Sequence, residues 1–172
     1  MKYLLLLSLA LTFVQAKLSD LNSFEADFKQ TITDDKQKVL NYQGSVIATK
    51  PQNALWNYTH PVNKQVYINS RVVTIIEPEL EQAIIKNIES TFDFFKLVHN
   101  AKKITKQNYE TFYKETKFII KTDAHEIINS ISYKDEFEND VVIYFTNQKV
   151  NKPLDNQLFV PNIPLDYDVI RD

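Results

Sequence analysis

Residues that could perform acid-base, nucleophilic or metal chemistry occur in the sequence, but their spacing forms no recognisable site. His60, His99 and His125 lie too far apart for two of them to reach one metal ion from a helix face or a hairpin. The carboxylates gather at expected strand joints, where turns favour short acceptors, as at Asp34 and Asp35. Neither a cysteine nor a glycine-flanked serine supplies a nucleophile. We therefore expect no catalytic residue, no metal site, no cofactor and no enzymatic activity.

The overall composition argues against nucleic acid and nucleotides as partners. Twenty basic and 22 acidic residues are mixed along 172 positions, which gives a net charge of -2 and predicts no basic stripe for a phosphate backbone. A single glycine excludes a glycine-rich phosphate loop, which needs several such positions. The hydrophobic content of 44% is enough for the core of one domain.

The first residues have the pattern of a secretory signal. One lysine precedes an apolar run from Tyr3 to Val14, and a Val-Gln-Ala cleavage site follows. The run is short for a membrane span of ~30 Å. We expect residues 1–16 to be a cleaved signal peptide and 17–172 to be one exported domain, soluble in the periplasm and, without cysteine, free of disulfides and lipid modification.

Alternation of apolar and polar residues predicts a mainly β domain. It begins at Phe24 and continues in about ten runs, interrupted by polar turns and by Pro51, Pro61 and Pro78. Helical spacing replaces it from Thr91 to His99, and short helical turns are expected after Leu18 and within residues 152–159. The pattern predicts one strongly curved antiparallel sheet, an incomplete open barrel, with two or three short helices on one side.

The inner face of that sheet is the candidate binding surface. If Trp56 points inward, alternation directs Ala54 and Tyr58 inward as well. Small residues, among them Gly44, favour an unfilled hollow, although for any single residue the same alternation is more typical of a filled core. The predicted cavity residues are Phe28, Val46, Ala48, Trp56, Tyr58, Val66 and Ile68.

Three segments resemble the periplasmic outer-membrane lipoprotein carriers of the LolA type. They are SFEADFKQTIT, GSVIATKPQNALWNYTHP and IIEPELEQ, which match F-x-A-x-F-x-Q, R-P-x-x-F-x-W-x-Y-x-x-P and Y-x-P-x-x-x-Q in order and spacing. The likeness covers Ser23 to Gln82 and, more loosely, the proline-rich tail. Two departures stand out, because Lys50 replaces the arginine before the first proline and Ala54 replaces an aromatic residue.

The resemblance implies a carrier that shields lipoprotein acyl chains between the inner and outer membranes. Phe92, Phe95 and Val98 would then belong to a lid over the cavity, and Lys50 would be the latch that holds the lid shut. The implied partners are acylated lipoproteins, an inner-membrane ATP-driven exporter and an outer-membrane receptor, with the carrier itself a monomer.

Three other functions stay open from the residues alone. A concave apolar sheet also suits an exported binding protein for another lipid or amphiphile. Remote carboxylates could pair in an exported hydrolase. A small membrane barrel is disfavoured, because charged residues crowd the predicted strands and no aromatic girdle frames a lipid-facing band.

Overall fold

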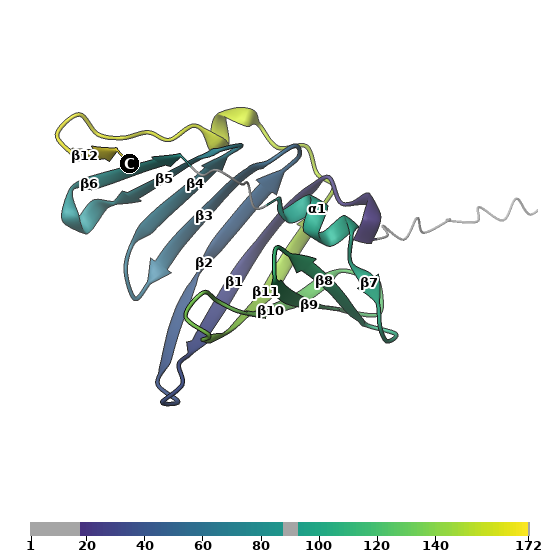
Figure 1. Cartoon of the computed structure of the whole chain (residues 1–172). Helices are drawn as coiled ribbons and strands as arrows, with labels where there is room; N and C mark the ends of the chain where they lie inside the picture. Colours follow the sequence, from purple (N-terminus) through teal and green to yellow (C-terminus); the bar gives the residue numbers. More distant parts are fainter. Residues whose placement is uncertain (1–17, 88–92, 172) are drawn as a thin grey trace, which may run out of the picture.

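The computed structural model describes residues 18–87 and 93–171, so the predicted signal peptide lies outside the described residues. The described residues form one twelve-stranded sheet in the order β12-β6-β5-β4-β3-β2-β1-β11-β10-β9-β8-β7 (Figure 1). The sheet is strongly curved and does not close, because β12 and β7 remain at its two edges. The predicted fold class, a mainly β open barrel with few helices, is confirmed.

The strands follow one another closely along the chain. They are β1 (Ser23–Thr33), β2 (Val39–Thr49), β3 (Asn53–His60), β4 (Lys64–Asn69), β5 (Val72–Glu77), β6 (Gln82–Asn87), β7 (Lys102–Lys103), β8 (Asn108–Tyr113), β9 (Thr116–Thr122), β10 (Ile128–Lys134), β11 (Asp140–Val150) and β12 (Asp168–Arg171). The described helices are α1 (Phe94–His99) and three 3₁₀ turns, η1 (Leu18–Asp20), η2 (Pro78–Leu80) and η3 (Asn156–Phe159).

Strand β1 lies at the centre of the sheet and joins two runs of hairpins. It pairs antiparallel with β2 over its whole length and with β11 on its other side, where Phe28 faces Phe145. The β1–β11 pairing connects residues more than 100 positions apart, whereas the strands on either side pair mostly with their sequence neighbours. One long-range ladder therefore joins the two runs of hairpins into a single sheet.

The edge strand β12 differs from the antiparallel prediction, because it runs parallel to β6. The chain leaves β11 at the end of the sheet where β1 starts, since the Asn151 amide donates to the carbonyl of Ser23. It then crosses to the opposite end of the sheet, where β6 starts and where the Asp168 amide donates to the carbonyl of Glu81. Because β12 starts where β6 starts, the two strands point the same way.

Gly44 marks a close approach of two strands and not an empty space. A Cβ atom at this position would lie 2.0 Å from the carbonyl oxygen of Asn57 on β3, and the β2–β3 register shifts between Gln43 and Gly44. Such irregularities bend a strand and increase its twist. The expectation that Gly44 helps to leave a hollow was therefore wrong, because the backbone of β3 occupies the space that a side chain at this position would need.

The two halves of the sheet bury opposite faces. On β1 and β8–β11 the concave face is buried in the main core, with Phe28, Phe118 and Ile120 among its members. On β4–β6 the buried residues Tyr67, Ile76 and Ala83 point to the other face by register, where Tyr167 and its neighbours in the C-terminal segment cover them. The concave face of β4–β6 is thus left without this cover.

Helix α1 is short but well anchored. Asp93 caps its N-terminus by accepting a hydrogen bond from the Lys96 amide, and Phe95, Leu97 and Val98 are buried. The described helix starts at Phe94, after the predicted start at Thr91, which lies outside the described residues. Within the described ranges, no helix has the length and apolar character needed to cross a membrane.

Candidate functional site

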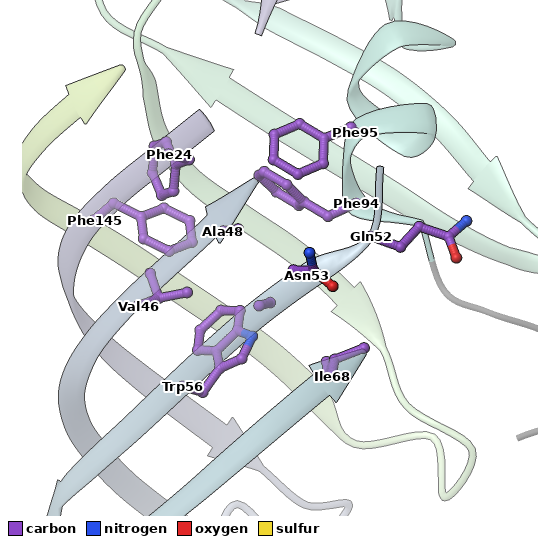
Figure 2. Close-up of a pocket in the computed structure, with 11 residues that line it drawn as sticks. Phe24, Val46, Ala48, Gln52, Asn53, Trp56, Ile68, Phe94, Phe95 and Phe145 are labelled. Atoms are coloured by element: carbon purple, nitrogen blue, oxygen red, sulfur yellow. The ribbon is translucent and has the colours of Figure 1, made fainter. Parts of the chain in front are cut away.

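An apolar hollow lies beneath α1, between the helix and the concave face of the sheet (Figure 2). Its empty volume is about 510 Å³, including the part that opens to solvent. The lining is apolar except for Gln52 and Asn53, and consists of Phe24, Val46, Ala48, Gln52, Asn53, Ala54, Trp56, Ile68, Phe94, Phe95 and Phe145. These residues come from β1, β2, β3, β4, β11, α1 and the β2–β3 turn.

Aromatic rings form a continuous series from the helix to the floor of the hollow. Consecutive ring centroids are 5.1 to 6.4 Å apart, and most of these pairs meet edge to face, a favourable geometry. In order, the series is Phe95, Phe94, Phe24, Phe145, Trp56, Phe28, Tyr58 and Tyr42. The helix therefore contacts the sheet through Phe94 and Phe24, and Trp56 is central to the series.

The structure brings four of the seven predicted cavity residues into the lining, namely Val46, Ala48, Trp56 and Ile68. Phe28 is buried below Trp56, and its ring also contacts Tyr58, so these two rings form the floor. Val66 faces Trp56 across the β3–β4 pair, on the same concave surface but outside the lining.

Two of the three predicted lid residues belong to the described part of the chain, and they have different surroundings. Phe95 lines the hollow, and Val98 is buried in the main core on the same helix. Phe92 lies outside the described residues.

The predicted latch, Lys50, is exposed at the end of β2. Its Nζ donates to Asn22 Oδ1 at 3.0 Å, next to the start of β1. The contact between the β2–β3 turn and α1 comes from a neighbouring residue, because Gln52 Nε2 donates to Asp93 Oδ2 at 3.1 Å. Asp93 thus caps the helix with one carboxylate oxygen and ties it to the sheet with the other.

The floor of the hollow holds a tyrosine with a perturbed acidity. Burial raises the pKa of Tyr58 to about 12, and the neighbouring Tyr133 and Tyr42 add to the shift. The Tyr58 hydroxyl faces Gln30 Oε1 at 3.2 Å, and Lys64 Nζ lies 4.7 Å from the centroid of its ring. Because the pKa is far above neutral pH, Tyr58 is an uncharged hydrogen-bond donor there and not a general base.

The candidate site includes residues that sequence reasoning did not place in it. Phe145 enters from β11, whose inward face became defined only through the pairing with β1. Val73, Ile75 and Ile84 extend the concave apolar surface across β5 and β6, in register with Ile68 and Val66. The signal for them is the run of apolar residues on both parities of these strands, which indicates burial on both faces.

The fold and the hollow define a class of protein, in which an unclosed and mostly antiparallel sheet has an apolar hollow under a short helix. The sequence model of the family described as "Outer membrane lipoprotein carrier protein LolA" matches residues 19–162. This chain belongs to the LolA family.

Curated relatives support the assignment over most of the chain. An outer-membrane lipoprotein carrier protein of Campylobacter jejuni is 38% identical over 150 residues, which cover 87% of each chain. Its counterpart from Wolinella succinogenes is 32% identical over 91% of each chain, and that of Helicobacter pylori strain J99 is 34% identical over 95% of this chain and 88% of the relative.

Solved structures share the fold at low sequence identity. An uncharacterised conserved protein from Thermus thermophilus aligns with a TM-score of 0.55 and 11% identity over 92% of this chain and 95% of its own. A LolA superfamily protein from Nitrosomonas europaea aligns with a TM-score of 0.53 and 9% identity over 82% and 91%. These likenesses show the fold.

Proposed function

We propose that this protein is a periplasmic carrier that shields the acyl chains of lipoproteins and shuttles them from the inner to the outer membrane. The observation that carries the proposal is the apolar hollow under α1, which continues into a half-buried concave surface on β3–β6. Membership of a family of lipoprotein carriers supports the same function.

The acyl chains would lie along the concave surface from the hollow towards β6. The proposed binding residues are the lining of the hollow, with Trp56 and Ile68 at its centre, and the continuation through Val66, Ile75 and Ile84. Phe28 and Tyr58 would close the floor. We propose α1 as the lid, with Phe94 and Phe95 resting on the cargo and Phe92 contributing from the adjoining segment.

The size of the hollow is consistent with a lid that has to move. The empty volume of about 510 Å³ includes open solvent and is an upper limit, so at the ~30 Å³ of a water molecule per methylene the hollow holds fewer than ~17 methylenes, less than one full acyl chain. Three acyl chains carry on the order of 40 methylenes. A triacylated cargo would therefore displace α1 or spread over the open surface of β4–β6.

Incomplete cover would also make release feasible. Full burial of ~40 methylenes at ~0.8 kcal/mol each would give ~30 kcal/mol, beyond the ~20 kcal/mol ceiling of non-covalent binding. A surface that shields the chains only partly keeps the cargo soluble and still exchangeable. The carrier would need no catalytic step of its own, because the exporter would supply the energy and a receptor or the outer membrane would accept the cargo.

Two contacts compete for the role of latch. Lys50 stays a prediction, supported by its position at the family's arginine. The Gln52–Asp93 hydrogen bond supports a second latch, since it joins the β2–β3 turn to the capping residue of α1. If Lys50 is the latch, replacing Lys50 should speed cargo exchange. If the Gln52–Asp93 hydrogen bond is the latch, replacing Gln52 should do so.

The test is to export the protein in a Gram-negative host, purify it from the periplasm and identify what it carries. Extraction with organic solvent followed by mass spectrometry should yield acylated lipoproteins bound to the wild type and far less bound to an Ala54→Phe variant, in which a ring fills the hollow. Recovery of glycolipid or free fatty acid instead would assign the chain to another amphiphile. Recovery of no lipid from a folded protein would refute the proposal.

A further inference from the structure

The charges of the chain are locally segregated, although they are evenly mixed over the whole sequence. Residues 94–122, from α1 to the end of β9, contain seven lysines and two glutamates, and Asp93, Asp123 and Glu126 flank this segment, whereas the complete chain has a net charge of -2. The seven lysines and two glutamates lie on α1, on the edge strands β7, β8 and β9, or in the turns that join these strands. The fold therefore collects a basic surface beside the lid.

Most of these lysines are available for an external partner. Lys103 pairs with Glu126, and Lys117 pairs with Glu110. The remaining five are exposed and form no ion pair with any residue that the structure describes; they are Lys96, Lys102, Lys106, Lys114 and Lys121. Glu115, in the turn after β8, is also exposed and reduces the local charge by one.

Two exposed apolar side chains interrupt the basic surface, one at each end of β8. Ile104 lies in the β7–β8 turn between Lys102 and Lys106, and it is 53% exposed. Phe112 lies near the end of β8 and is 58% exposed. Phe112 shares a groove with Lys96 of α1 and with Lys114, which makes the lid part of the same surface; Asp93, the capping residue of α1, is the one acidic residue in the lining of this groove.

The opposite edge of the sheet provides a contrast within the same molecule. Leu80 and Leu165, close to the start of β6 and β12, are at least as exposed as Ile104 and Phe112. Their neighbours are acidic, however, and include Glu79, Glu81, Asp166 and Asp168. The exposed apolar residues at one edge thus have basic neighbours, and those at the other edge have acidic neighbours.

We propose that the basic edge formed by α1, β7, β8 and β9 docks on an anionic lipid bilayer. Lysines near an anionic membrane surface gain attraction from the lipid phosphates, worth about fivefold in binding each, and exposed apolar side chains among them enter the headgroup layer. Ile104 and Phe112 would be the inserted residues. The strand β8 spans roughly 20 Å between them, enough for two separate points of attachment.

This docking rests on the proposed carrier function and adds to it the orientation of the carrier on the membrane. The lid α1 lies in the docking surface through Lys96, so the membrane would contact the element that covers the hollow. Acyl chains could then pass between bilayer and hollow over a short path. An acidic protein partner would suit the lysines, but it would not require the two exposed apolar residues at the ends of β8.

Co-sedimentation of the mature protein with lipid vesicles tests the docking. We expect binding to vesicles of phosphatidylglycerol and phosphatidylethanolamine at low salt, weakening with added salt, and little binding to phosphatidylcholine. Exchanging Lys102, Lys106 and Lys114 together for glutamine should weaken binding about 100-fold, and Ile104→Ser with Phe112→Ser at least tenfold. The matched control, Leu80→Ser with Leu165→Ser, should leave binding unchanged.

Several outcomes would overturn docking. They are absence of binding to anionic vesicles, equal binding to phosphatidylcholine, or a control variant as weak as the Ile104 and Phe112 variant. If vesicle binding is absent while the lysine variant still slows cargo transfer, the basic edge serves an acidic protein instead. Affinity for a soluble acylated lipopeptide, measured in parallel, should be equal in all variants; a wild type that binds no lipopeptide would refute the carrier function itself.

Discussion

Both halves of the sheet direct alternate apolar residues to the concave face, but the two halves differ in how deeply these residues are buried. On β1 and β9–β11 the concave residues are buried, among them Phe28, Ile120 and Ile143. On β3–β6 the corresponding residues are all half-buried; they are Ala54, Trp56, Tyr58, Val66, Ile68, Val73, Ile75 and Ile84. In one half the concave face is therefore part of the stabilising core, and in the other half it stays accessible to a ligand.

The open half can leave that face free because it is stabilised from behind. Its convex side holds a second core of Tyr67, Ile76 and Ala83, which the C-terminal segment covers with Ile163, Tyr167 and Val169. A sheet with one covered face does not need to fill the other. The comparison indicates that the C-terminal segment, by covering the convex face of β4–β6, allows their concave face to stay partly exposed.

The same substitution in each half should separate stability from binding. Ile120→Ala in the filled half should lower the free energy of unfolding by about 3 kcal/mol, because Ile120 is fully buried. Ile75→Ala in the open half should cost about 1 kcal/mol, because its side chain is only half-buried. Urea unfolding of both variants measures the difference. Equal losses would contradict the division into two halves.

Tyr58 on β3 contacts Phe28 on β1 and so connects the two halves, and its ionisation should lower the free energy of unfolding. Its pKa in the folded protein is raised to about 12, so the unfolded chain loses this proton first, near pH 10. Stability should be unaffected below pH 10 and should fall by about 2 kcal/mol as the pH rises towards 12. Tyr58→Phe should remove this part of the decline in unfolding experiments. Identical pH dependence in variant and wild type would show that Tyr58 is not the group whose ionisation destabilises the fold.

Filling the hollow should weaken binding without harming the fold. Ala54 is half-buried in the lining of the hollow, so a ring introduced by Ala54→Phe would occupy the space beneath α1. We expect at least tenfold weaker binding of an acylated lipopeptide by titration calorimetry, with little change in unfolding. Ala124→Phe, in the exposed turn between β9 and β10, is the control for added hydrophobicity. Undiminished affinity in Ala54→Phe would place the ligand elsewhere.

The latch should have the smallest effect. Gln52→Leu removes the hydrogen bond to Asp93 but leaves the cap of α1 intact, so the lid should open more often and lipopeptide association should accelerate about threefold. Stopped-flow fluorescence measures this rate. Lys50→Leu is the companion variant, and a larger acceleration there than in Gln52→Leu would support the latch that the sequence predicted.

The sequence was sufficient for the local parts of this architecture. The hairpins from Ser23 to Glu77 were readable from alternation and prolines, and parity placed Ala54 and Tyr58 on the same face as Trp56, although it did not decide which face was the inner one. The β1–β11 ladder was not readable, because nothing local specifies which distant strands pair, and with it the inward position of Phe145 was lost. The parallel pairing of β12 and the Gln52–Asp93 contact were inaccessible for the same reason.

The location of the acyl chains can be tested with Trp56, the only tryptophan of the chain and part of the lining. A triacylated lipopeptide with bromine atoms on its acyl chains quenches only a fluorophore in close contact. Titration should quench Trp56 emission strongly with the brominated lipopeptide and not with the unbrominated one. Saturated binding of both without any difference in Trp56 emission would mean that the chains do not lie in the hollow.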